Sequence, residues 1–186
     1  SFSADFAIGA VDGANITTTD KDNGKEALSA VYGFQIDLTT SFTGEDSLDI
    51  SIDAGNAGAA GVAEFDLNST GDALKVDGIA YSFPVGDKIS AIVGAQGTDG
   101  SVAFTTACTY GGPSNTLDDC GNVQSNFVGK GTTVGASYAF TDEFTMAVGY
   151  AGDGVTASKG LATSEGLDAV GINAAYTTDT YGISAT

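Results

Sequence analysis

Residues 28–38 read Leu-Ser-Ala-Val-Tyr-Gly-Phe-Gln-Ile-Asp-Leu, and they carry the strongest structural signal in the chain. Every second residue from Leu28 to Leu38 is apolar, and the residues between them are small or polar apart from Val31. Because successive side chains of a strand point to opposite faces, the pattern predicts a strand with one apolar and one polar side. Its length matches the about 9–11 residues of a tilted strand that crosses a bilayer, whereas soluble strands usually have about 5–6. The stretch therefore favours a membrane β-barrel.

The same alternation recurs along the rest of the chain. It is found in residues 2–10, 47–54, 89–95, 134–140, 144–150, 170–176 and 181–185. No window has the apolar spacing of a helix, and none holds about 18 apolar residues in a row. We therefore expect one all-β domain over residues 1–186, an antiparallel meander of about ten long strands that forms a transmembrane β-barrel or part of a larger barrel.

The connections between these segments are of two kinds, short and long. The short ones, rich in turn-forming residues, are 41–46, 84–87, 141–143 and 177–180. The long ones, rich in Gly, Asn, Asp, Ser and Thr, lie near 12–26, 55–61, 97–130 and 151–165. Alternation of tight turns with longer loops is typical of outer-membrane barrels.

The charge balance excludes several classes of function. The chain has 24 acidic residues, 6 lysines, no arginine and no histidine, which gives a net charge of −18. Nucleic-acid binding relies on basic patches, so we expect no nucleic-acid partner. A nucleophile activated by histidine cannot be built either, and we expect no enzyme. The mean hydropathy is nevertheless slightly positive, as expected if apolar side chains face lipid and acids face water.

The two cysteines, Cys108 and Cys120, lie in a loop rich in Gly and Asp. Their even number and close spacing predict one disulfide that constrains a long external loop and forms in an oxidising compartment. A loop of this size would gain about 3 kcal/mol of stability by the chain-entropy model. Two free thiols are the alternative, and a zinc site lacks the ligands it would need.

Three segments carry a resemblance to a known family. The run Thr39–Leu48, with Ala54-Gly-Asn56 after it, resembles the strand–turn–strand signature of cyanobacterial outer-membrane porins, described as iron-uptake or carbohydrate-selective porins. Tyr81–Asp87 and residues 166–184 are similar to other hairpins of that family. The resemblance implies a channel in the outer membrane at the cell surface, in contact with lipid, that passes small hydrophilic solutes. It also implies a homo-oligomer, trimeric in a porin. Members are longer, with about sixteen strands, so this chain would be a shortened or partial relative.

The polar sides of the expected strands are the candidate pore lining. Their members are Ser29, Gln35, Asp37, Asp49, Ser51, Asp53, Thr133, Ser137 and Thr145. Rings of acidic side chains make cation-preferring pores, and these strands supply three aspartates and no lysine. Asp49 and Asp53 would lie roughly 13 Å apart along one strand, too far for a pair of catalytic carboxylates. Asp37 should lie across a hairpin from the neighbourhood of Asp49.

Two further interpretations stay open from the sequence. Residues 20–26, Asp-Lys-Asp-Asn-Gly-Lys-Glu, offer oxygen ligands for calcium, although a plain turn is the favoured interpretation and no cofactor is expected. The alternating strands could instead build a structural or adhesive surface protein, in which strands pair between subunits to form filaments or sheets. The strand lengths, aromatics and resemblance favour the channel, whereas the short chain and the lack of arginine favour the assembly.

Overall fold

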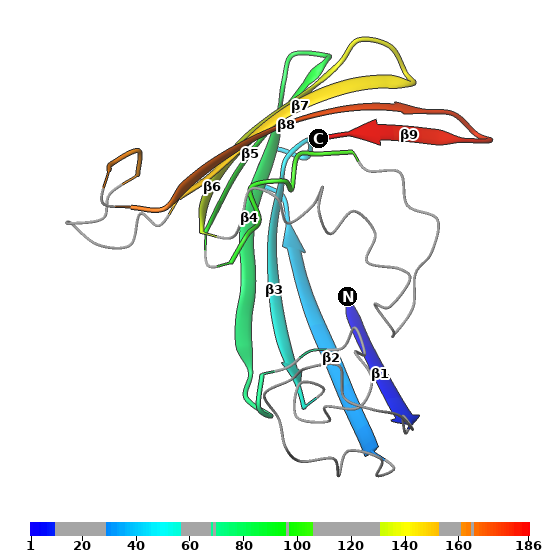
Figure 1. Ribbon diagram of the computed structural model, residues 1–186, viewed down its shortest axis with the longest axis vertical. Coiled ribbons are helices and arrows are strands. Elements are labelled where there is room, and N and C mark those ends of the chain that lie inside the picture. The colour runs from blue at the N-terminus through cyan, green and yellow to red at the C-terminus, as the bar shows by residue number, and fades with distance from the viewer. Residues whose placement is uncertain are drawn as a thin grey trace, which may run out of the picture. The chain divides into compact units, whose positions relative to one another are not determined.

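The computed structural model describes residues 1–9, 29–56, 68, 70–95, 97–105, 131–152, 161–164 and 166–186. These residues form nine strands and no helix (Figure 1). The strands are β1 (Phe2–Gly9), β2 (Ser29–Thr40), β3 (Ser47–Gly55), β4 (Lys75–Val85), β5 (Ile89–Ala95), β6 (Thr132–Ala139), β7 (Phe144–Gly152), β8 (Asp168–Thr177) and β9 (Gly182–Ala185).

The nine strands belong to one sheet in which every strand pairs with its neighbours in chain order. The expected all-β antiparallel meander is therefore confirmed. The described residues hold nine strands, not the expected count of about ten. The longest of these strands, β2, has 12 residues and contains most of the alternating stretch at 28–38.

The chain divides into two compact units. Unit 1 contains the described residues of Ser1–Ile36 and Ile52–Lys75. Unit 2 contains those of Asp37–Ser51, Val76–Thr109 and Cys120–Thr186.

Unit 1 is built on the pairing of β1 with the first part of β2. The register runs from Phe2 opposite Ile36 to Gly9 opposite Ser29, and it aligns the aromatic residues of the two strands on one face. The rings of Phe2 and Phe34 lie 5.9 Å apart. The end of β3 joins this pair, because the Asn56 backbone N–H donates to the Tyr32 carbonyl at 3.1 Å.

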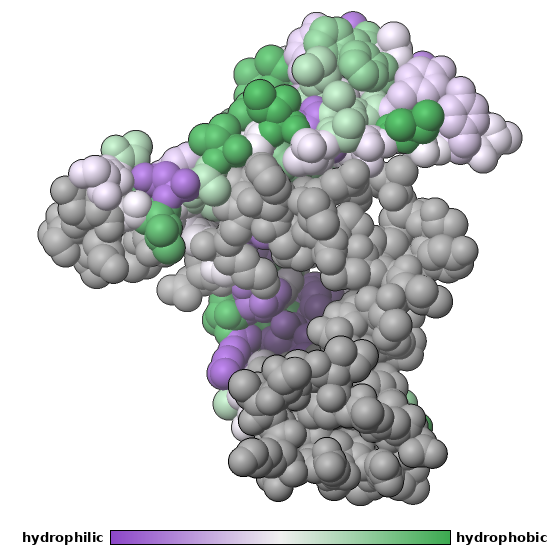
Figure 2. Space-filling view, in the orientation of Figure 1, coloured by the Kyte–Doolittle hydropathy of each residue, from purple (hydrophilic) through white to green (hydrophobic). Residues whose placement is uncertain are grey.

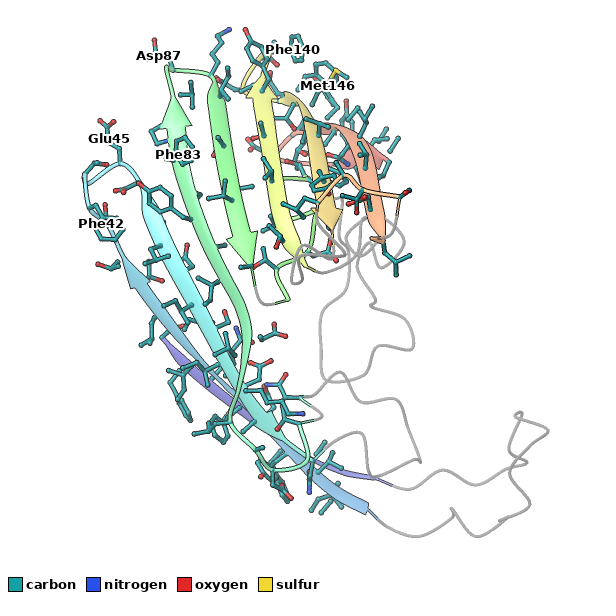
Figure 3. The ribbon with its side chains drawn as sticks, turned by 90° about the vertical axis from the view of Figure 1, so that its left-hand side faces the viewer. Phe42, Glu45, Phe83, Asp87, Phe140 and Met146 are labelled. Atoms are coloured by element: carbon teal, nitrogen blue, oxygen red, sulfur yellow. The ribbon has the colours of Figure 1, made fainter. Side chains whose placement is uncertain are left out.

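Unit 2 contains β4 to β9 and the turn between β2 and β3. Its short turns lie at one end, where Figure 3 shows Phe42 and Glu45 on the first turn, Asp87 on the second and Phe140 on the third. The turn expected at 84–87 is shorter than the sequence indicated. Pro84 and Val85 still pair with Ser90 and Ile89, and the chain turns only at Gly86, whose φ of +68° suits glycine.

The turn between β2 and β3 is organised around one carboxylate, Asp46. Its Oδ1 accepts hydrogen bonds from the Ser41 hydroxyl at 2.6 Å and from the backbone N–H groups of Phe42 and Thr43 at 3.0 and 2.8 Å. Its Oδ2 accepts a bond from the Tyr81 hydroxyl of β4 at 2.6 Å. The turn within the porin-like run Thr39–Leu48 is therefore closed by its own side chains and tied to a neighbouring strand.

These bonds make the turn resistant to acid. Hydrogen bonds from Ser41, Tyr81 and the Thr43 backbone hold the pKa of the Asp46 carboxyl well below its usual value of about 3.9. A lowered folded-state pKa gives stability that is complete above the unfolded value and is lost only as the pH falls through the folded value. We expect the Phe42 and Thr43 amides to keep their protection from hydrogen exchange below pH about 3.9. In Asp46→Ala they should lose it at every pH.

Glu45→Ala is the matched control for this measurement, since it removes a neighbouring exposed carboxylate from the same turn. Its amide protection should match that of the unmodified protein. Protection that disappears near the ordinary pKa of an aspartate would contradict the assigned role of Asp46.

Candidate functional site: the small-residue face of unit 2

The cross-strand register of unit 2 sorts its side chains onto two contrasting faces. Val93, Val134, Tyr150 and Val170 lie opposite one another on β5 to β8, and Ala91, Ala136, Val148 and Ile172 form the next row. We call this side the apolar face. Its members are Tyr81, Phe83, Val85, Ile89, Ala91, Val93, Val134, Ala136, Tyr138, Phe144, Met146, Val148, Tyr150, Val170, Ile172, Ala174, Tyr176 and Ile183.

Many of the largest side chains of the apolar face are exposed. Ile172 is 62% exposed, Val170 61% and Val134 50%. Figure 2 shows hydrophobic side chains on the surface of unit 2, in the region where Figure 1 draws β7 and β8. A contiguous set of exposed large apolar side chains is unusual on a sheet surrounded by water, and it marks this part of the described chain as a candidate contact surface.

Aromatic side chains gather at the short-turn end of unit 2. The ring centroids of Tyr138 and Phe140 lie 4.7 Å apart and those of Phe140 and Phe144 5.4 Å apart. Further pairs are Phe42–Tyr81, Tyr81–Phe83 and Tyr176–Tyr181. The aromatics therefore follow the row of turns from β2 to β9.

The opposite side, which we call the small-residue face, has small or polar members apart from Ile92. They are Ala80, Ser82, Ser90, Ile92, Gly94, Thr133, Gly135, Ser137, Thr145, Ala147, Gly149, Ala151, Ala169, Gly171, Asn173 and Ala175. The buried apolar side chains of the described chain are correspondingly small, namely Val31, Ala54, Ala147, Ala151 and Ala175. Unit 2 is thus arranged with large apolar residues outside and small or polar ones covered.

Residues Gly97–Thr105, which we call the inner segment, lie on the small-residue face. At its start, the Thr98 hydroxyl donates to the carbonyls of Ile79 and Ala95 at 2.9 and 2.8 Å. The Thr98 carbonyl accepts from the hydroxyl of Thr133, which is completely buried, at 2.8 Å. At its end, the Thr105 backbone N–H donates to Asn173 Oδ1 at 3.0 Å. Hydrogen bonds therefore hold the inner segment at both ends.

Glycines of β6 and β7 provide the space for this segment. Gly135, Gly149 and Gly171 lie opposite one another on β6, β7 and β8. A Cβ placed on Gly149 would come within 1.8 Å of the Gly100 carbonyl oxygen, which no real contact allows. The backbone of the inner segment approaches β7 as closely as it does only because residue 149 has no side chain.

Three of the residues expected to line a pore lie on this face. Thr133 is covered by the inner segment, and the Thr145 hydroxyl donates to that of Thr105 at 3.4 Å. Ser137 lies between them, opposite Ser90 and Ala147. The inner segment thus covers a part of the face that the sequence alone suggested was open.

Asp37, Asp49 and Ser51 form a second polar group in unit 2. Ser51 donates to Asp37 Oδ1 at 3.0 Å, which confirms that Asp37 lies across the hairpin near Asp49. Asp49 accepts bonds from the hydroxyls of Thr39 and Ser47, each at 2.7 Å. Both carboxylates therefore accept hydrogen bonds from neighbouring hydroxyl groups.

The remaining expected pore-lining residues belong to unit 1. Gln35 lies opposite Ser3, and Ser29 lies opposite Gly9. Asp53 is near the end of β3 and is buried, with 8% of its surface exposed.

Other expectations fall outside the described residues. Cys108, Cys120 and the candidate calcium loop 20–26 belong to that part of the chain, so the disulfide stays a prediction. Within the described ranges, no group of three or more Cys, Asp or Glu side chains is placed to hold a metal ion. No helix in the same ranges is long and apolar enough to span a membrane.

Comparisons with protein-family models, with curated proteins and with solved structures find no match to this chain.

Proposed function

We propose that this chain forms, or contributes to, an outer-membrane channel for the passive diffusion of small hydrophilic solutes or ions. The observation that carries the proposal is the distribution of residues in unit 2. Its apolar face is exposed, whereas its small-residue face is covered or polar. Outer-membrane barrels have this arrangement, because lipid surrounds them and water fills the interior.

Strand length and aromatic position support the same function. β2, β4 and β8 have 12, 11 and 10 residues, enough for a tilted strand to cross the hydrocarbon core of a bilayer. The aromatics beside the short turns match the girdle that barrels place at a membrane interface. In this proposal the chain is a shortened or partial relative of the cyanobacterial porins. It contacts lipid and assembles as a homo-oligomer, a trimer if the chain is a porin.

The inner segment gives the channel its restriction. It lies on the face that would border water, and of its polar side chains Asp99 and Thr105 are half-buried, whereas Thr98 and Ser101 are buried. Asp99 Oδ1 accepts bonds from the Ser101 backbone and hydroxyl at 2.8 and 2.5 Å. A small hydrophilic solute would pass beside this segment instead of through an open barrel.

Cation preference is the expected selectivity of such a channel. Asp37, Asp49 and Asp53 lie on strands without lysine, and acidic groups on low-dielectric walls concentrate cations. Replacing all three by asparagine should flatten the preference, which is measured as the reversal potential of planar bilayers under a KCl gradient. Higher salt should weaken the preference too, since the screening length falls to about 3 Å at 1 M. Asparagine substitutions at acids of the long loops are the control and should have less effect.

One observation favours the alternative, a surface protein that assembles by strand pairing between subunits. The nine described strands alternate in direction, so β1 and β9 run the same way, and direct pairing between them would be parallel. Bacterial single-chain barrels have an even number of antiparallel strands. A strand from a neighbouring subunit would remove this mismatch. Anion preference would refute the assignment of the aspartates to the lumen. Absence of conductance, with filaments or sheets formed in detergent-free buffer, would favour the alternative.

A further inference from the structure

Asn173 is a buried polar residue in the middle of β8, with 1% of its surface exposed. A carboxamide has one oxygen that accepts and two N–H groups that donate, and here all three functions are used. Oδ1 accepts from the Thr105 backbone N–H at 3.0 Å. Nδ2 donates to the Ala185 carbonyl at 3.3 Å and to the Thr186 hydroxyl at 3.1 Å.

The side chain therefore joins three parts of unit 2: β8, the end of the inner segment and the end of β9. Its orientation is fixed by its partners, because a backbone N–H can only donate and a backbone carbonyl can only accept. The inner segment is held at its start by the bonds of Thr98, whereas its end has the Thr105 backbone bond to Asn173 and a 3.4 Å hydroxyl contact with Thr145.

We propose that Asn173 is a positioning residue with two separate roles: its Oδ1 locks the end of the inner segment, and its Nδ2 holds the end of β9 beside β8. The inner segment is then a fixed restriction, not a moving gate. The consequence for conductance rests on the proposed channel function, but the lock itself does not.

Hydrogen exchange distinguishes the bond of Asn173 Oδ1 to the inner segment from the bonds of its Nδ2 to the end of β9. Leucine has the same number of side-chain heavy atoms and the same branching as asparagine, but it has neither donor nor acceptor. In Asn173→Leu, the Thr105 amide and the amides of β9 should both exchange faster by about tenfold or more, the effect of losing one buried hydrogen bond. In Thr186→Val, which removes only the hydroxyl that accepts from Nδ2, the faster exchange should be confined to β9.

Thr177→Val is the matched control, since it alters an exposed side chain of the same strand on the same face. It should leave Thr105 exchange unchanged. Unchanged Thr105 exchange in Asn173→Leu would overturn the lock. Faster Thr105 exchange in Thr186→Val, equal to that in Asn173→Leu, would show general loosening and would also overturn it.

Single-channel recording tests the consequence for the channel. If the lock fixes the restriction, Asn173→Leu should give a larger unit conductance and more open-channel noise than the unmodified protein. Faster exchange with unchanged conductance would support the lock and overturn the role of the segment as the restriction. An unmodified protein without conductance would overturn the channel function, and the exchange measurements would still decide the lock.

Discussion

Replacing Val148 by arginine should lower the free energy of unfolding of the protein in a lipid bilayer by about 2–4 kcal/mol. Val148 lies in the middle of β7 on the apolar face, opposite Ala136 and Ile172, and it is 46% exposed. Arginine on a lipid-facing position near the bilayer centre must leave water or distort the membrane, and it carries a cost of this size. Urea titration of the protein folded into liposomes measures the difference.

The same substitution distinguishes a membrane protein from a soluble one. If water surrounded the apolar face, an exposed arginine would change stability by only about 0.5 kcal/mol or less. The control is Asp142→Arg, which places arginine in the exposed turn between β6 and β7, beyond the ends of the strands. It should have little effect in the bilayer. Equal and small effects of both substitutions would remove the main support for the proposed channel.

Replacing Gly149 by alanine should displace the inner segment and destabilise the protein. The added methyl group would lie 1.8 Å from the Gly100 carbonyl oxygen and 3.3 Å from the Phe104 ring. Since the closest atom belongs to the backbone, a side-chain rotation cannot relieve the overlap. We expect a loss at or above the upper end of the about 1–3 kcal/mol typical of overpacking, measured by equilibrium unfolding.

Gly78→Ala is the control, because it adds the same methyl group on β4 toward the same segment. There the nearest atom, the Thr98 hydroxyl oxygen, would lie 3.4 Å away, which is an ordinary contact. This substitution should cost much less. If Gly149→Ala is as stable as Gly78→Ala, the inner segment does not lie against β7 as described.

The strands were predictable where apolar and polar residues alternate without interruption, because alternation follows directly from strand geometry. β2, β5 and β7 begin and end within a few residues of the segments that the sequence indicated. The first half of β4 was missed. There Lys75 and Asp77 lie on the same face of the strand as Tyr81 and Phe83. Charged residues therefore interrupt the apolar alternation, although the strand continues.

The inner segment could not be predicted, for a physical reason. Residues 97–105 have no alternation of their own, and their position depends on space created by Gly135 of β6 and Gly149 of β7. Gly135, Gly149 and Gly171 are far apart in the sequence, and only the register brings them into one row. The role of Asn173 is equally a property of the assembled sheet, since its partners lie 12, 13 and 68 residues away along the chain.

The opposed faces of β7 imply that alternate positions are under different kinds of selection. At Met146 and Val148, which are 38% and 46% exposed, the hydropathy of a substituted side chain should matter more than its volume, because an exposed side chain has room to change in size. At Ala147, Gly149 and Ala151, polarity matters less than size, since these residues are buried. In divergent relatives of this chain, residues on one face of β7 would therefore stay apolar, and residues on the other face would stay small. Such relatives could share few identical residues and still form the same sheet.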